Sequence, residues 1–157
     1  GYSLNFGLKK RPEILGDSIP FDVSLIGCGI AMSGANNPDP GYCEDNLLSA
    51  REICNLDLSN VDFVILSACQ TAKGDIYDEG TAGLIRGLKN AGVKTVLATL
   101  WEVDDLATMR FMQEFYHQLS KGVSKYEAYR GAQQVLRDNN MDEPYYWAPF
   151  ILIDSLD

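Results

Sequence analysis

The stretch DFVILSACQTAKG, residues 62–74, decides the fold of this chain. Its apolar run, Phe63–Leu66, predicts a buried strand, and small and polar residues that include Cys69 follow the run. In open α/β sheets, side chains at the carboxyl ends of strands lie at the crevice where ligands bind. A free cysteine is also often buried as a small hydrophobe. Position alone therefore leaves both a reactive and a structural role open for Cys69.

Downstream of this stretch, the sequence predicts a helix and a second buried strand. Residues 78–92 have the pattern of an amphipathic helix, with acidic residues at its positive end and Gly92 at its stop. Residues 93–101 predict the strand, which ends at Trp101. Two strands joined by a helix form a right-handed βαβ unit with parallel strands. Three glycines share one face of the helix, which we expect to pack closely on the sheet: Gly80, Gly83 and Gly87.

Upstream of the central stretch, two shorter elements are predicted. Alternating apolar residues at 21–27 are typical of a half-exposed strand. Residues 46–55 have the spacing of a short helix, for which Asp45 or Asn46 would be the cap.

The C-terminal part of the chain predicts two helices and a last strand. A long helix is expected over residues 104–121, and a capping box precedes a second helix at 125–138. Residues 145–153 predict the strand, and Pro149 within it indicates an edge position or a bend. The expected apolar face of the long helix consists of Leu106, Met109, Met112, Phe115, Tyr116 and Leu119.

This order of elements predicts an α/β domain in which helices flank a mainly parallel sheet. A chain of 157 residues fits one domain, which can bury ~70% of the surface that its unfolded chain exposes. The chain begins without a first strand and helix to match the sheet. We therefore expect residues 1–157 to form the C-terminal part of a larger domain.

Composition and charge argue against several classes of function. Acidic residues exceed basic ones, 22 to 13, which gives a net charge of −9. Such a field repels nucleic acids and anionic lipids, so we expect neither a nucleic-acid nor a membrane partner. No apolar run approaches the ~20 residues of a membrane span.

Cysteine and histidine usage indicates a cytoplasmic protein without a metal site. The cysteines are irregularly spaced in a chain with ample core, which favours reduced thiols over a disulfide framework. The four are Cys28, Cys43, Cys54 and Cys69. His117 is the sole histidine, and we expect it at the surface or at its boundary rather than in a ligand cluster.

Several strings together resemble the C-terminal half of a CHAT domain. They read LSACQTAKGDIYDEGTAGLIRGLKNAG at 66–92, VLATLWEVDDLAT at 96–108, FYHQLSKG at 115–122 and YYWAPFILI at 145–153. Upstream, SGAN at 33–36 precedes a helix of the LSAREI kind, as in such domains. CHAT domains are caspase-like cysteine peptidase domains often found with TPR repeats, and they are related to separase, caspases and gingipains. The resemblance covers residues 22–153 and implies a caspase-like layered fold.

The resemblance implies that Cys69, in the SAC(E/Q)T motif, is a nucleophile that forms a thioester with a peptide carbonyl. This chemistry requires a thiolate, because the protonated thiol is a weak nucleophile. In the family a histidine followed by a glycine supplies the base, and backbone N–H groups of that glycine and of the cysteine form the oxyanion hole, worth ~3–4 kcal/mol per donor in other acyl-transfer enzymes. No histidine precedes Cys69 here, and His117 matches no catalytic position. Gly1 stands where the glycine after the missing histidine is expected.

Substrate binding is expected at the loop after the second strand, residues 100–105. In related peptidases this region builds the first specificity pocket, and carboxylates there would pair with an Arg or Lys side chain. Asp104 and Asp105 are candidates for this role, but they could equally cap the next helix. Trp101 is either a pocket wall or part of the core.

We therefore predict a cysteine endopeptidase that acts on a polypeptide substrate and needs no cofactor, with its histidine base outside this chain. Its expected partners are TPR repeats or the N-terminal half of the same protein. The alternative is a catalytically inactive CHAT-like interaction or regulatory module. A doubly wound domain that binds a small ligand is disfavoured, because no GxGxxG loop follows a first strand.

Overall fold

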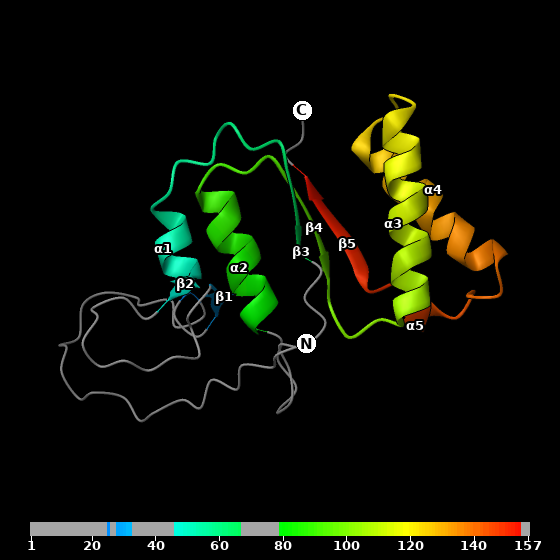
Figure 1. Ribbon diagram of the computed structural model, residues 1–157, viewed down its shortest axis with the longest axis horizontal. Helices are drawn as coiled ribbons and strands as arrows, with labels where there is room; N and C mark the ends of the chain where they lie inside the picture. Colours follow the sequence, from blue (N-terminus) through cyan, green and yellow to red (C-terminus); the bar gives the residue numbers. More distant parts are fainter. Residues whose placement is uncertain (1–24, 26–27, 33–45, 67–78, 155–157) are drawn as a thin grey trace. The chain divides into compact units, whose positions relative to one another are not determined.

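Figure 1 shows the computed structural model, which describes residues 25, 28–32, 46–66 and 79–154. The chain divides into two compact units, each considered by itself. Unit 1 comprises residues 1–62 and 71–94, and unit 2 comprises residues 63–70 and 95–157.

Unit 2 contains a three-stranded sheet with the order β3-β4-β5. β3 (Phe63–Leu66) runs parallel to β4 (Thr95–Thr99), with Val64 opposite Val96, and β5 (Phe150–Asp154) pairs antiparallel with β4. The predicted parallel pairing of the two central strands is confirmed, as is the α/β class. Among the described strands the sheet is mixed rather than mainly parallel.

The last strand is shorter than predicted. Residues 145–147 belong to a short helix, α5 (Pro144–Trp147), and the strand begins only at Phe150. Proline at the first position of α5 suits a helix start, because its fixed φ is already helical and its missing N–H is not needed there. The edge position predicted for this strand is confirmed within the described sheet.

Two long helices, α3 (Asp105–Ser120) and α4 (Lys125–Asp138), pack against each other and share one apolar core with the sheet (Figure 1). The ring of Phe111 on α3 stacks on Phe150 of β5, with centroids 3.9 Å apart. Phe115 contacts Phe63 of β3 with centroids 5.5 Å apart. These contacts orient α3 on the sheet.

The apolar face predicted for α3 is wrong in half of its members. The fully buried residues are Ala107, Phe111 and Phe115, which recur every four residues. Met112 and Leu119 are partly buried, as expected. The remaining members of the predicted face are exposed: Leu106 by 44%, Met109 by 47% and Tyr116 by 54%. The stacking of Phe111, which the predicted face omitted, on Phe150 sets the rotation of the helix.

The ends of α3 and α4 agree with local capping chemistry. Gly122, which follows α3, has a φ of +80°, a left-handed conformation that favours glycine. Ser124 caps α4, and its hydroxyl and the Glu127 carboxylate form the predicted capping box. Helix α4 buries Ala128, Ala132 and Leu136 against the core.

Unit 1 contains a two-stranded antiparallel ladder and two helices. β1 (Gly29–Ala31) pairs with β2 (Leu47–Ser49), and α1 (Ala50–Cys54) contacts α2 (Glu79–Asn90). The strand predicted at 21–27 lies outside the described residues except for Leu25.

The prediction of a helix over residues 46–55 is wrong in its first part. Residues 47–49 form β2, and Ser49, not Asp45 or Asn46, caps α1. The Ser49 side chain accepts from the N–H of Glu52, whose carboxylate accepts from the N–H of Ser49 in return. This reciprocal box starts the helix at Ala50, four residues after the start that the apolar spacing indicated.

Helix α2 confirms the predicted helix and its stop at Gly92, which has a φ of +101°. Gly87 lies where α2 approaches α1 closely. A Cβ atom at Gly87 would lie 2.7 Å from the carbonyl oxygen of Ala50.

Candidate functional site

The residues expected to carry the chemistry lie partly inside and partly outside the described ranges. Cys69 and Gly1 lie outside the described residues. Of the described residues, those that precede Cys69 most closely in the sequence form β3, which ends at Leu66 opposite Ala98 of β4. Because β3 and β4 are parallel, their carboxyl ends meet at the same edge of the sheet, where ligands bind in α/β folds.

The neighbouring strand β4 is buried along its whole length and ends at Thr99. Thr99 is 4% exposed, and its hydroxyl oxygen finds no hydrogen-bond partner within the described part of the chain. The backbone N–H of the next residue, Leu100, donates to the carbonyl of Pro149 at 3.0 Å. This bond ties the start of the 100–105 loop to the segment ahead of β5.

Trp101 lies at the surface of this loop. Its side chain is 41% exposed, and its indole N–H donates to the backbone carbonyl of Tyr145 on α5 at 3.3 Å. The loop is anchored by Val103, which is 3% exposed and belongs to the core of unit 2. Of the two roles open for Trp101, its exposure fits the wall of a surface site better than the core.

Asp104 and Asp105 have separate roles at the start of α3. Asp104 is the N-cap, and one of its carboxylate oxygens accepts from the N–H groups of Leu106 and Ala107, both at 3.0 Å. Asp105 is exposed in the first helical turn, where a carboxylate also interacts favourably with the helix dipole. The capping role is therefore observed, and a substrate-binding role for either residue remains a prediction.

Tyr145 is a residue at this site that the sequence pattern did not single out. Its side chain is 52% exposed, and its ring packs edge-on against Tyr146 with centroids 5.5 Å apart. An available signal was Pro144 directly before two tyrosines, since proline favours the first position of a helix. Because apolar residues follow Tyr145, the sequence instead predicted that residue 145 belongs to the last strand.

A buried polar network on α4 holds α5, and with it Tyr145, in place. Gln133 is 6% exposed, and its amide donates to the Tyr129 hydroxyl at 2.8 Å and to the Trp147 carbonyl at 3.2 Å. The Tyr129 hydroxyl in turn donates to the Phe150 carbonyl at 2.8 Å. Burial raises the pKa of Tyr129, which keeps this hydroxyl a donor.

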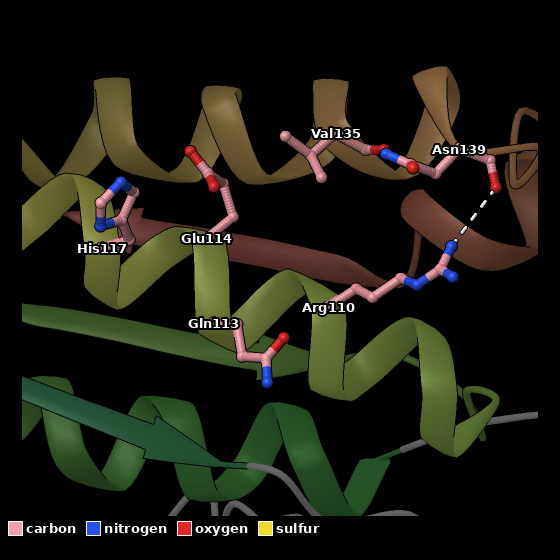
Figure 2. A pocket seen from close by; sticks show the side chains of 6 residues that line it. All are labelled: Arg110, Gln113, Glu114, His117, Val135 and Asn139. Atoms are coloured by element: carbon pink, nitrogen blue, oxygen red, sulfur yellow. Dashed lines mark hydrogen bonds between the residues drawn. The ribbon is translucent and has the colours of Figure 1, made fainter.

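A depression between α3 and α4, called the α3–α4 groove, has a volume of about 360 Å³ (Figure 2). The guanidinium of Arg110 donates to the Asn139 carbonyl across it at 3.4 Å. Its lining residues are Arg110, Gln113, Glu114, His117, Val135 and Asn139.

His117 is exposed on α3, which confirms the predicted surface position. It lies 12 residues beyond Asp105, about 18 Å along the helix at 1.5 Å per residue. That separation is too large for His117 to serve as a base near Asp105.

The described residues offer neither a metal cluster nor a membrane span. Within the described ranges, no group of three His, Cys, Asp or Glu side chains could hold a metal ion. None of the described helices is both long and apolar enough to span a membrane.

Comparison of the sequence with known proteins shows its family. The CHAT domain model matches residues 22–155, across both units. The chain belongs to the CHAT domain family. This confirms the resemblance found in the sequence. That the two units form a single domain remains a prediction.

Relatives of this CHAT chain include tetratricopeptide repeat protein 28 from two mammals. The Mus musculus protein is 34% identical over 110 residues, which cover 69% of this chain and 4% of that protein. The Homo sapiens protein is 30% identical over 126 residues, which cover 80% of this chain and 5% of that protein. The chain thus matches only a small part of each curated relative, and both are named for tetratricopeptide repeats.

Proposed function

We propose that this chain is the nucleophile-bearing part of a caspase-like cysteine endopeptidase, with Cys69 as the nucleophile. The observation that carries the proposal is the parallel pairing of β3 with β4. Cys69 follows the last residue of β3 by three positions, and the exposed loop of Trp101 and Asp105 follows β4. Nucleophile and substrate loop would then lie at one edge of the sheet, in a cytoplasmic CHAT protein with a caspase-like layered fold.

In the proposed reaction, the Cys69 thiolate attacks the carbonyl carbon of the scissile peptide bond. The tetrahedral intermediate expels the amine, which takes a proton from a histidine outside these 157 residues, and a thioester remains. Water then attacks the thioester carbon, loses a proton to the same histidine and releases the carboxylic acid and the thiolate. Backbone N–H groups of Cys69 and Gly1 would stabilise the oxyanion in both steps.

The proposed substrate has a basic side chain before the scissile bond. The exposed indole of Trp101 offers a face for a cation, and Asp104 and Asp105 would supply negative charge beside it. Since one oxygen of Asp104 is engaged in capping, Asp105 would carry more of this interaction.

The test is thiol reactivity and peptidase activity in the full-length polypeptide. Cys69→Ala should abolish cleavage of a peptide with a central arginine, whereas Cys54→Ala, at a half-buried thiol of α1, should retain it. Iodoacetamide should label Cys69 before Cys43 or Cys54, because its thiolate would be favoured. Equal labelling rates at all thiols, or full activity of Cys69→Ala, would refute the proposal.

A second function, a non-catalytic docking module, is favoured by one observation. The chain has a single histidine, and that residue lies on α3 about 18 Å along the helix from the candidate substrate loop. A peptidyl acyloxymethyl ketone with arginine at its reactive end separates the two functions. Covalent modification of Cys69 in the full-length polypeptide supports the peptidase, and failure to modify it supports the docking module.

A further inference from the structure

The register of β5 places the helix α5 near the edge of the sheet at which β3 and β4 end. Because β5 is antiparallel to β4, it begins where β4 ends, and Phe150 lies opposite Thr99. β3 is parallel to β4 and ends at the same edge. α5 ends at Trp147, three residues before Phe150. Tyr145 on α5 therefore lies near the edge that the proposed function assigns to the nucleophile and the substrate loop.

The segment 145–149 holds the substrate loop through two backbone carbonyls. The indole N–H of Trp101 donates to the carbonyl of Tyr145 at 3.3 Å, and the N–H of Leu100 donates to that of Pro149 at 3.0 Å. The side chains of Trp101 and Tyr145 are 41% and 52% exposed. Since the bond from Trp101 uses only the backbone of Tyr145, the phenol ring takes no part in it. Two exposed aromatic side chains thus stand on adjoining segments.

Contacts of its neighbours with α4 and with the core fix the position of Tyr145. The buried amide of Gln133 donates to the Trp147 carbonyl at 3.2 Å, and the guanidinium of Arg137 lies 3.7 Å from the centre of the Trp147 ring. Tyr146 packs against the core of unit 2. An exposed aromatic residue whose backbone is held in this way loses little conformational freedom when its ring contacts a ligand.

The two segments that these hydrogen bonds join are acidic. Residues 101–105 carry three carboxylates, residues 142–145 carry two, and neither segment contains a lysine or an arginine. Carboxylates beside aromatic faces favour a cation. The planar guanidinium of arginine also stacks on aromatic rings, whereas the ammonium group of lysine is a compact, strongly hydrated charge. The combination therefore fits an arginine side chain better than a lysine side chain.

We propose that Tyr145 is a specificity-determining residue of this site, and that its ring contacts an arginine side chain of the substrate together with the ring of Trp101. The inference rests on the proposed function, because it adds a residue to the substrate site of the proposed peptidase. It goes further in naming a residue outside the substrate loop and in assigning a preference for arginine over lysine. Tyr126 on α4, which is 59% exposed, serves as the matched tyrosine away from this edge.

Cleavage of paired peptides by the full-length polypeptide tests the specificity. Wild type should have a higher kcat/KM for a peptide with arginine before the scissile bond than for the matched lysine peptide. Tyr145→Ala keeps the carbonyl that accepts from Trp101 but should lower this preference about fivefold, as expected for loss of one cation–π contact. Tyr145→Phe, which keeps a ring, and Tyr126→Ala should retain the preference. An unchanged preference in Tyr145→Ala would overturn the inference and leave the peptidase standing.

Peptide binding gives a readout that does not depend on cleavage. In full-length Cys69→Ala, calorimetry should show that adding Tyr145→Ala raises the Kd of the arginine peptide about fivefold, whereas adding Tyr126→Ala leaves it unchanged. Equal Kd values, or no binding of the arginine peptide, would contradict the role of Tyr145. If binding depends on Tyr145 while wild type cleaves no peptide, the peptidase proposal fails and the recognition of arginine by Tyr145 holds.

Discussion

Trp101 and Tyr145 are 44 residues apart in the sequence, and a single hydrogen bond joins them at 3.3 Å. Neither side chain is buried, so the bond does not serve core packing. It fixes an indole in the loop that follows β4, the same loop that leads to the carboxylate of Asp105. At the scale of single residues, the bond to Tyr145 holds Trp101 at the surface, where the proposed function would have it contact the substrate.

Two glycines provide a matched residue-scale prediction. Gly87→Ala should destabilise the protein by about 1–3 kcal/mol, because overpacking costs this much and its Cβ would lie 2.7 Å from the Ala50 carbonyl oxygen. Gly131→Ala should instead stabilise it by about 0.4–1 kcal/mol, since its nearest contact, the side chain of Gln118, is at 3.7 Å. Urea unfolding measures both, and a stabilising Gly87→Ala would contradict the close packing of α1 on α2.

At the scale of elements, capping residues next to each helix decide where it starts, whereas contacts with distant segments decide how it is oriented. The capping box of Ser124 and Glu127 was readable from the sequence and starts α4 where expected. The orientation of α3 depends on Phe111 stacking on Phe150, a contact between a helix and a distant strand. Periodicity predicted an apolar face that omitted Phe111, and the stacking of Phe111 on Phe150 buries a different face of α3.

The capping box of α4 gives a pH prediction. Hydrogen bonds from the Ser124 hydroxyl and backbone N–H hold the pKa of Glu127 below its usual value of 4.5. A lowered folded-state pKa contributes stability that is present above pH 4.5 and is lost as the pH falls through the lowered value. Glu127→Gln should therefore lower the Tm at about pH 7, and the difference from wild type should shrink toward about pH 3.

Glu143→Gln is the matched control for this pH series. Glu143 also caps a helix, α5, but makes no side-chain capping hydrogen bond. Because Glu143 makes no such bond, Glu143→Gln should lower the Tm at about pH 7 less than Glu127→Gln does. A Glu127→Gln difference that stays constant between about pH 7 and about pH 3 would mean that the charged form is not what stabilises the helix start.

At the scale of the whole chain, its charge would favour the cationic substrate proposed above. The net charge of −9 raises the local concentration of basic peptides and repels acidic ones. This long-range effect is separate from contacts in the site, because added salt screens it over about 8–10 Å at physiological ionic strength.

Raising the ionic strength should therefore lower the activity of the proposed peptidase on basic substrates. In the full-length polypeptide, we expect kcat/KM for an arginine-containing peptide to fall several-fold between about 0.05 M and 0.5 M salt, because screening weakens long-range attraction. A matched citrulline peptide, which has no charge, should change little. Equal salt dependence for both peptides would exclude steering by the charge of the protein.

The sequence by itself determined the features that depend on neighbouring residues. Apolar runs and caps predicted β3, β4, α2 and the starts of α3 and α4, and motif strings predicted the CHAT family. Tertiary structure alone decided which face of α3 is buried, that Tyr145 meets Trp101, and that Gly87 serves contact with α1. Each of these depends on atoms brought together from distant segments, and local periodicity carries no information about that geometry.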